Sequence, residues 1–174
     1  MPTFEQLAPE YARLLRTMEI ADKKRGPIEA AALKIIAHRE EYQRVSEATG
    51  VPWALIGALH NREASCDFTC HLHNGDSLKK PTYHVPKNRP SPKGGPFTWE
   101  ESAIDAIALD GLNKVKGWTI ERAAFEAEKF NGFGYRSKGH VSPYLWSYSS
   151  HYKGGKFTAD GVYDRSESTR LNSS

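Results

Sequence analysis

The sequence lacks any long apolar run, so we expect no segment that inserts into a membrane. Its first residues, Met-Pro-Thr-Phe-Glu-Gln, have neither the basic nor the apolar region of a signal peptide, which predicts synthesis in the cytoplasm. Internal repeats are also missing, which argues against a repeat protein. With 174 residues, of which 39% are hydrophobic, residues 1–164 are predicted to form one domain with a sizeable core.

Cysteine is scarce, and its placement decides between a metal site and free thiols. Cys66 and Cys70 lie beside His71 and His73, which raises the question of a zinc site. This arrangement compresses four ligands into eight residues, whereas structural zinc sites usually draw their ligands from separated segments. We therefore expect no bound metal and two reduced thiols, because a cytoplasmic protein rarely keeps a disulfide.

An excess of charge is also missing, since the formal net charge is only +3. The basic residues are scattered, and their only run of three is Lys23-Lys24-Arg25. A weakly basic balance suits an anionic polymer, but without a basic cluster we do not expect binding to nucleic acid.

The first third of the chain has apolar residues at helical spacing, which predicts three helices. An amphipathic first helix is expected to end at Gly26-Pro27. A second helix is predicted over residues 28–49, with Gly50 as its C-terminal stop. The third begins near Pro52 and is apolar over most of its surface, so we expect it to be the buried central helix.

The rest of the chain combines helices with irregular segments. The predicted elements are a short strand over 82–85, helices over 98–111, 119–130 and 142–152, and a hairpin over 156–163 that turns at Asp160-Gly161. Residues 86–96 form a Pro/Gly/Lys-rich loop and a candidate cleft rim. Residues 165–174 lack a core pattern, are expected to be disordered, and resemble a translated adapter sequence. The predicted class is mainly α with a small β-hairpin region.

Glu63 lies at the end of the predicted central helix, directly before a polar loop rich in histidine. Desolvation at such a position disfavours the charged carboxylate and raises its pKa. A carboxyl group that stays protonated near neutral pH can act as a general acid. The alternative is that Glu63 is a solvated residue at a helix end.

Four longer strings carry a resemblance to a known family. They are His-Leu-His-Asn-Gly-Asp at 71–76, Phe-Thr-Trp-Glu-Glu-Ser at 97–102, Phe-Asn-Gly-Phe-Gly-Tyr at 130–135 and Ser-Pro-Tyr-Leu-Trp-Ser at 142–147. In this order they resemble lysozyme-family endolysins of phages and prophages, over residues 5–164. More distantly, Glu63 and the aromatic-Asn-Gly motif resemble motifs of goose-type lysozymes and soluble lytic transglycosylases.

The resemblance implies a lysozyme-like fold and cleavage of the β-1,4 bond between N-acetylmuramic acid and N-acetylglucosamine, without a cofactor. Glu63 would protonate the departing oxygen. Asp76, with Asp67 as second choice, would position water or stabilise the charge on the sugar. Asn74-Gly75-Asp76 also fits a plain turn, and that alternative stays open. We expect a monomer that leaves the bacterial host cytoplasm and acts on peptidoglycan strands in the periplasm.

Six further residues are candidates for contact with the glycan. They are His71, His73, Asn74, Asn131, Gly132 and Tyr135. The two histidines either bind sugar hydroxyls or hold their loop. Asn131 can donate to a sugar carbonyl, or Asn131-Gly132 simply ends a helix. We expect the helix end at Glu63, the loop at 71–76 and the segment at 130–135 to converge.

The chain departs from the goose-type and transglycosylase pattern at two points. Ala64 follows Glu63 where those proteins have Ser, and no Gly-Leu-Met-Gln string follows. Residue roles are therefore carried over from them only to Glu63 and Asn131. The alternatives left open are a lytic transglycosylase, a chitin-type substrate, a non-catalytic glycan-binding or phage structural module, and a zinc amidase using ligands near residue 70.

Overall fold

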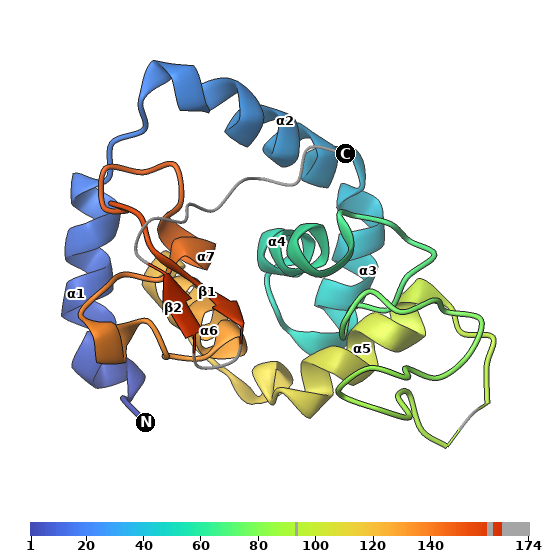
Figure 1. Ribbon diagram of the computed structural model, residues 1–174. Helices are drawn as coiled ribbons and strands as arrows, with labels where there is room; N and C mark the ends of the chain where they lie inside the picture. The colour runs from blue at the N-terminus through green and yellow to red at the C-terminus, as the bar shows by residue number, and fades with distance from the viewer. Residues whose placement is uncertain (93, 160–161, 165–174) are drawn as a thin grey trace. The chain divides into compact units, whose positions relative to one another are not determined.

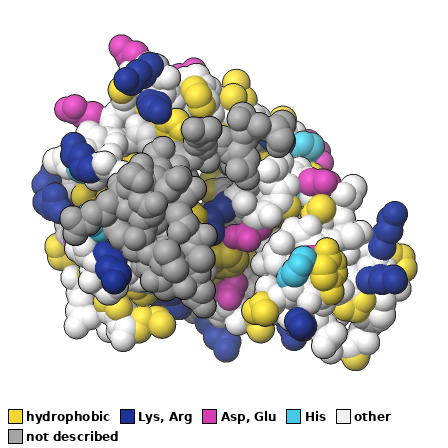
Figure 2. Space-filling view, viewed as in Figure 1, with side chains coloured by type: hydrophobic (Ala, Val, Ile, Leu, Met, Phe, Trp, Pro, Cys, Tyr) yellow, Lys and Arg dark blue, Asp and Glu magenta, His cyan; other side chains and the backbone are white. Residues whose placement is uncertain are grey.

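The computed structural model describes residues 1–92, 94–159 and 162–164, which are mainly helical (Figure 1). The mainly α class predicted from the sequence is confirmed. None of the helices in these residues is long and apolar enough to cross a membrane. On the face drawn in Figure 2, Lys and Arg side chains are spread over the surface rather than gathered into one patch.

The chain divides into two compact units. Unit 1 comprises Met1–Glu29 and the described residues from Thr119 onward, and unit 2 comprises Ala30–Trp118. Helix α2 (Asp22–Ala37) begins in unit 1, ends in unit 2 and has no buried residue. The two ends of the chain thus build one unit and its middle builds the other.

Unit 1 is built around α1 (Phe4–Thr17) and α6 (Ile120–Asn131), which pack against each other (Figure 1). Thr3 and Gln6 close a capping box at the start of α1, and apolar residues recur on one face of that helix. The short helix α7 (Pro143–Trp146) packs against α6. The buried core residues of this unit are Tyr11, Leu14, Ala124, Phe125 and Trp146.

A buried carboxylate, Glu128, links the two main helices of unit 1. The Tyr11 hydroxyl donates a hydrogen bond to it at 2.5 Å, and Arg136 pairs with it at 2.9 Å. A buried charge is tolerated when it is paired and hydrogen-bonded. These contacts therefore join α1, α6 and the 3₁₀ turn η2 (Arg136–Lys138).

The strands β1 (Lys156–Ala159) and β2 (Val162–Asp164) pair in antiparallel register, with Lys156 opposite Asp164. The predicted turn at Asp160-Gly161 lies outside the described residues, so the hairpin as a whole stays a prediction. The predicted disorder of residues 165–174 also concerns residues outside the description.

Unit 2 packs α3 (Arg39–Thr49) against α4 (Trp53–Ala64) and α5 (Trp99–Leu109), and the 3₁₀ turn η1 (Leu112–Lys114) follows α5. Gly50 ends α3 with a φ of 75°, as the sequence predicts. The capping box predicted at the start of α5 is also present. The buried residues of α4 are Leu55, Ile56, Gly57, Leu59 and His60, which confirms that this helix is central.

His60 is the polar centre of this second core. Its Nδ1 lies 3.1 Å from the Tyr42 hydroxyl, and its Nε2 accepts a hydrogen bond from the Trp99 indole at 3.1 Å. Because the side chain is buried, desolvation lowers the pKa of His60 to about 4. The ring therefore stays neutral and acts as a hydrogen-bonded member of the core.

Three predicted elements are wrong. Gly26-Pro27 does not end a helix, since α2 runs through it and the break falls at His38. Residues 82–85 form no strand, because the amides of Tyr83 and His84 donate to a side-chain carboxylate instead of a neighbouring strand. The helix predicted over 142–152 is limited to the four residues of α7.

Candidate functional site

Glu63 lies in the last turn of α4, just before the helix ends at Ala64. Its side chain is 19% exposed, and burial raises the pKa of its carboxyl group above the ordinary value. The positive charge of Arg62, whose Nη1 lies 3.5 Å from Oε1, opposes this shift, whereas the negative charge of Asp110 adds to it. The group therefore holds its proton to a higher pH than a solvated Glu while keeping some access to solvent.

The loop after α4 passes directly against the backbone of Glu63. Gly75 has a φ of 78°, and a Cβ atom built on it would lie 2.8 Å from the Glu63 carbonyl oxygen. Only glycine fits this combination of a left-handed backbone and a close approach. The predicted neighbourhood of Glu63 and the 71–76 loop is therefore confirmed at Gly75.

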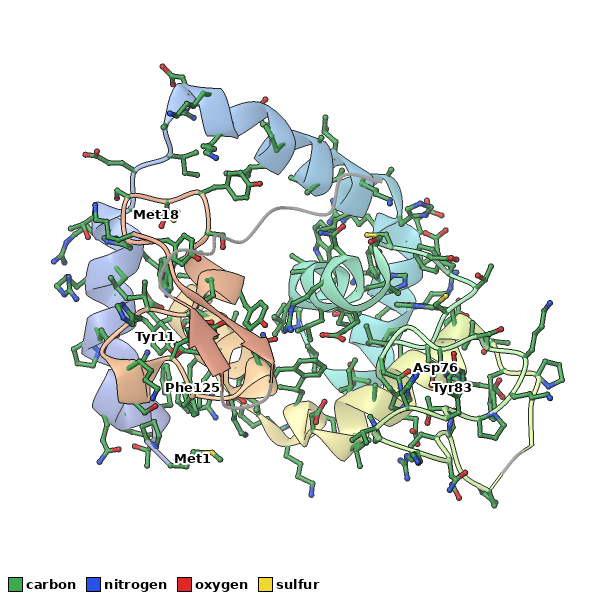
Figure 3. All side chains as sticks on the ribbon, viewed as in Figure 1. Met1, Tyr11, Met18, Asp76, Tyr83 and Phe125 are labelled. Atoms are coloured by element: carbon green, nitrogen blue, oxygen red, sulfur yellow. The ribbon has the colours of Figure 1, made fainter. Side chains whose placement is uncertain are left out.

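Asp76 is buried, and its carboxylate braces a neighbouring segment (Figure 3). Oδ2 accepts hydrogen bonds from the amides of Tyr83 at 2.8 Å and His84 at 2.9 Å, and Oδ1 accepts one from the His84 ring at 2.7 Å. Burial alone raises the pKa of Asp76, but these hydrogen bonds outweigh it and hold the pKa below its ordinary value. The ionised carboxylate thus fixes residues 83–84 in place.

Asn74 completes the turn that the sequence left open as an alternative. Its Oδ1 accepts a hydrogen bond from the Asp76 amide at 3.0 Å, and its Nδ2 donates to the Val85 carbonyl at 3.4 Å. Asn74 and Asp76 therefore both support the loop through hydrogen bonds. Their predicted contacts with substrate stay predictions.

His71 and His73 are buried, and each has both ring nitrogens engaged. His71 lies 2.8 Å from the Ser102 hydroxyl through Nδ1 and donates to the Lys80 carbonyl through Nε2 at 2.9 Å. His73 pairs with Asp105 through Nε2 at 2.8 Å and lies 3.4 Å from Ser102 through Nδ1. Of the two predicted roles, these contacts favour holding the loop over binding sugar hydroxyls.

Ser102, His73 and Asp105 have the residue types of a hydrolytic triad, but they cannot act as one. Ser102 is completely buried, so no substrate carbonyl can reach its hydroxyl. Arg89 instead forms two hydrogen bonds to the Asp105 carboxylate, at 2.5 and 2.9 Å. The cluster anchors the loop to α5.

Sequence reasoning missed the anchoring role of Ser102, Asp105 and Arg89. A signal was available for the first two, because residues three apart lie on the same face of a helix. Arg89 gave no such signal, since its partner is 16 residues away and the intervening loop has no periodicity.

Asn131, Gly132 and Tyr135 belong to unit 1 and are described within it. Asn131 is the last residue of α6, and its Nδ2 donates to the Ala127 carbonyl at 2.7 Å. Its Oδ1 is buried without a hydrogen-bond partner among the described residues. Gly132 follows with a φ of 80°, and Tyr135 is buried with its ring 5.8 Å from that of Tyr144. These contacts match the helix-ending alternative, while the predicted glycan contacts stay predictions.

The two cysteines are free, and each thiol lies near an oxygen acceptor. Cys66 Sγ is 3.5 Å from the Asn61 side-chain oxygen, and Cys70 Sγ is 3.6 Å from the Asp67 carboxylate. Within residues 1–92, 94–159 and 162–164, no group of three or more His, Cys, Asp or Glu side chains is placed to hold a metal ion.

Comparison of the chain with protein-family models, curated proteins and solved structures finds no match. Any functional assignment therefore depends on the residues described above.

Proposed function

We propose that this chain is a peptidoglycan-cleaving glycosidase of lysozyme type, with Glu63 as its general acid. The observation that carries the proposal is the combination of a raised pKa, caused by burial, with a side chain that keeps 19% of its surface exposed. A general acid needs both, because it must hold a proton near neutral pH and also reach the substrate.

The proposed step transfers the Glu63 proton to the oxygen of the glycosidic bond. As that bond breaks, positive charge develops on the anomeric carbon of the sugar. Water then adds to this carbon and gives up a proton, which restores the acid. The burial that raises the pKa of Glu63 keeps its carboxyl group protonated to a higher pH, so the proton is available when a substrate oxygen approaches.

The first test is the release of soluble fragments from purified peptidoglycan by the Glu63→Gln variant. We expect a loss of about 10²–10⁴-fold in rate, because the amide cannot donate the required proton. Glu47→Gln is the matched control, since Glu47 is an exposed residue on α3 of the same unit. An unchanged rate for Glu63→Gln would remove Glu63 from the mechanism.

A lytic transglycosylase is the second candidate, and the hydrogen bonds of Asp76 favour it. A carboxylate that already accepts three hydrogen bonds from residues 83–84 is poorly placed to activate water. In a transglycosylase the 6-hydroxyl of the substrate attacks the anomeric carbon, so one carboxyl group suffices. Mass spectrometry separates the two reactions, because only the transglycosylase leaves 1,6-anhydro ends on the products.

A further inference from the structure

Tyr83, His84 and Val85 are three consecutive exposed residues on unit 2, which we call the tip, and they lie in the segment that Asp76 braces. Figure 3 shows Tyr83 close to Asp76. Tyr83 is 64% exposed and Val85 is 81% exposed. The rings of Tyr83 and His84 lie together, with their centroids 4.2 Å apart. The tip therefore presents two neighbouring rings and an aliphatic side chain to solvent.

The backbone of this tip is firmly held, although its side chains are exposed. Asp76 receives the amides of Tyr83 and His84, and Asn74 donates to the carbonyl of Val85. At the base of the loop, the Thr82 amide donates to the Arg89 carbonyl at 2.8 Å. Preorganisation of this kind reduces the entropy lost on binding, as expected of a recognition surface.

The exposed charged residues in the stretch of sequence around the tip are basic. The sequence has no Asp or Glu from Ser77 to Trp99, and the exposed Lys79, Lys80 and Lys87 lie in this stretch. In Figure 2 the part of unit 2 at lower right carries yellow and cyan side chains with dark blue ones around them. The tip is thus an aromatic surface in a positively charged setting, which is complementary to a ligand with an apolar face and carboxylates.

We propose that the Tyr83–His84–Val85 tip is a binding site for a glycan strand of β-1,4-linked N-acetyl sugars that carries carboxylates, as peptidoglycan does. The apolar face of a sugar ring stacks on Tyr83, and an acetamido or hydroxyl group bonds to Nε2 of His84, whose Nδ1 is held by Asp76. The lysines attract the carboxylates of the attached peptides.

This inference rests on the proposed function for its choice of ligand, and the structure links the two sites along one short path. A Cβ atom built on Gly75 would lie 2.8 Å from the carbonyl oxygen of Glu63, Asp76 follows Gly75 in the chain, and the Asp76 carboxylate binds the tip. A strand held by the tip is therefore held near the end of α4, where the proposed acid lies.

The test is co-sedimentation of the full-length Glu63→Gln protein with purified insoluble peptidoglycan, and separately with chitin. Tyr83→Ala is expected to weaken binding about tenfold, whereas Tyr83→Trp keeps it. Leu33→Ala is the matched control, because Leu33 is 66% exposed on α2. Circular dichroism checks that the variants fold, which we expect because the Tyr83 side chain is exposed and only its amide binds Asp76.

A second pair of variants tests the charge. Lys79→Gln combined with Lys87→Gln is expected to weaken binding to peptidoglycan but not to neutral chitin. Unchanged binding of peptidoglycan by this double variant would overturn the choice of an anionic strand.

The outcomes for the tip and for the proposed function are distinguishable. If adding Tyr83→Ala to the Glu63→Gln chain leaves binding to peptidoglycan unchanged, while the unsubstituted chain releases fragments, the tip proposal is wrong and the enzyme proposal stands. If the unsubstituted chain releases no fragments, while Tyr83→Ala weakens the binding of the Glu63→Gln chain, the tip proposal stands and the enzyme proposal is wrong.

Discussion

At the scale of single residues, Glu63 places an ionisable group where ionisation is disfavoured. Burial raises the pKa of its carboxyl group in the folded chain above the value of about 4.3 expected when unfolded. The folded state therefore binds this proton more tightly than the unfolded state. The stabilisation that this proton contributes to the folded chain is present below the pKa of Glu63 in the unfolded chain. It is lost as the pH rises through the pKa of Glu63 in the folded chain.

Glu63→Gln removes this loss because an amide does not ionise. We expect the variant to have a higher free energy of unfolding than the natural chain at about pH 8, and the difference to shrink toward about pH 4. Urea denaturation at several pH values measures this. A natural chain that matches the variant at every pH would show that Glu63 is not desolvated.

Adding a Cβ atom at Gly75 or at Gly111 strains a left-handed backbone, but only at Gly75 does it also cause a steric clash. Comparing the two positions therefore separates these two costs in stability. Their φ angles are 78° and 71°, but an added Cβ meets the Glu63 carbonyl only at Gly75. Gly111→Ala should cost about 1–2 kcal/mol of stability for its left-handed conformation, and Gly75→Ala should cost more. Chemical denaturation of both variants provides the comparison, and equal losses would count against the close approach at Gly75.

The sequence indicates the position of Glu63 more clearly than the roles of its neighbours. The apolar pattern before Glu63 predicts a buried helix with Glu63 in its last turn, but it leaves open whether the side chain is buried or solvated. The contacts of Asp76 could not be predicted, because its partners are backbone amides seven and eight residues away in an irregular segment. Periodicity carries no information about where such a segment folds back.

At the scale of elements, buried histidines join the helices and the loop of unit 2. His60 lies between Tyr42 of α3 and Trp99 of α5, while His73 ties the loop to Asp105 of α5. Desolvation lowers the pKa of His73 as well, although Asp105 opposes the shift. Both histidines are therefore buried as neutral rings that resist protonation.

The folded chain should lose stability in mild acid because the unfolded chain binds protons at these histidines more readily. For His60 the loss begins near pH 6.5 and is complete near pH 4, and it amounts to on the order of 3 kcal/mol. His60→Gln should be less stable at neutral pH but should have a flatter pH profile. Thermal unfolding across this range tests the prediction, which an equally steep profile for His60→Gln would contradict.

Helix positions were more predictable than helix ends. The sequence predicts that Pro27 stops a helix, yet it lies in the second turn of α2, where its missing N–H removes only one backbone hydrogen bond. Gly26 is exposed and no atom lies within 4 Å of an added Cβ, so no close contact requires glycine at this position of the helix. Propensity is a weak prior at such positions.

At the scale of the whole molecule, the chain forms one unit from a continuous segment and another from its two ends. No feature of the sequence indicates that α1 packs on α6, because an apolar face does not identify the partner that covers it. The contact is nevertheless specific, since Tyr11 donates to Glu128 across a separation of 117 residues.

A fragment of residues 30–118 is expected to fold alone, because it contains the whole core of unit 2. Circular dichroism and a cooperative thermal transition would show this. A chain that lacks residues 1–21 should instead lose the packing of unit 1, since α1 supplies Tyr11 and Leu14 to that core. A non-cooperative 30–118 fragment would mean that unit 2 depends on residues outside it.

The pairing of α1 with α6 also sets an order of events during synthesis on the ribosome. At about 5–20 residues per second, the 117 residues between Tyr11 and Glu128 take roughly 6–23 seconds to make. Throughout that interval the apolar face of α1 has no partner, while the segment that forms unit 2 emerges and can fold. The nascent N-terminal helix is therefore the part of this protein that a chaperone would be expected to hold first.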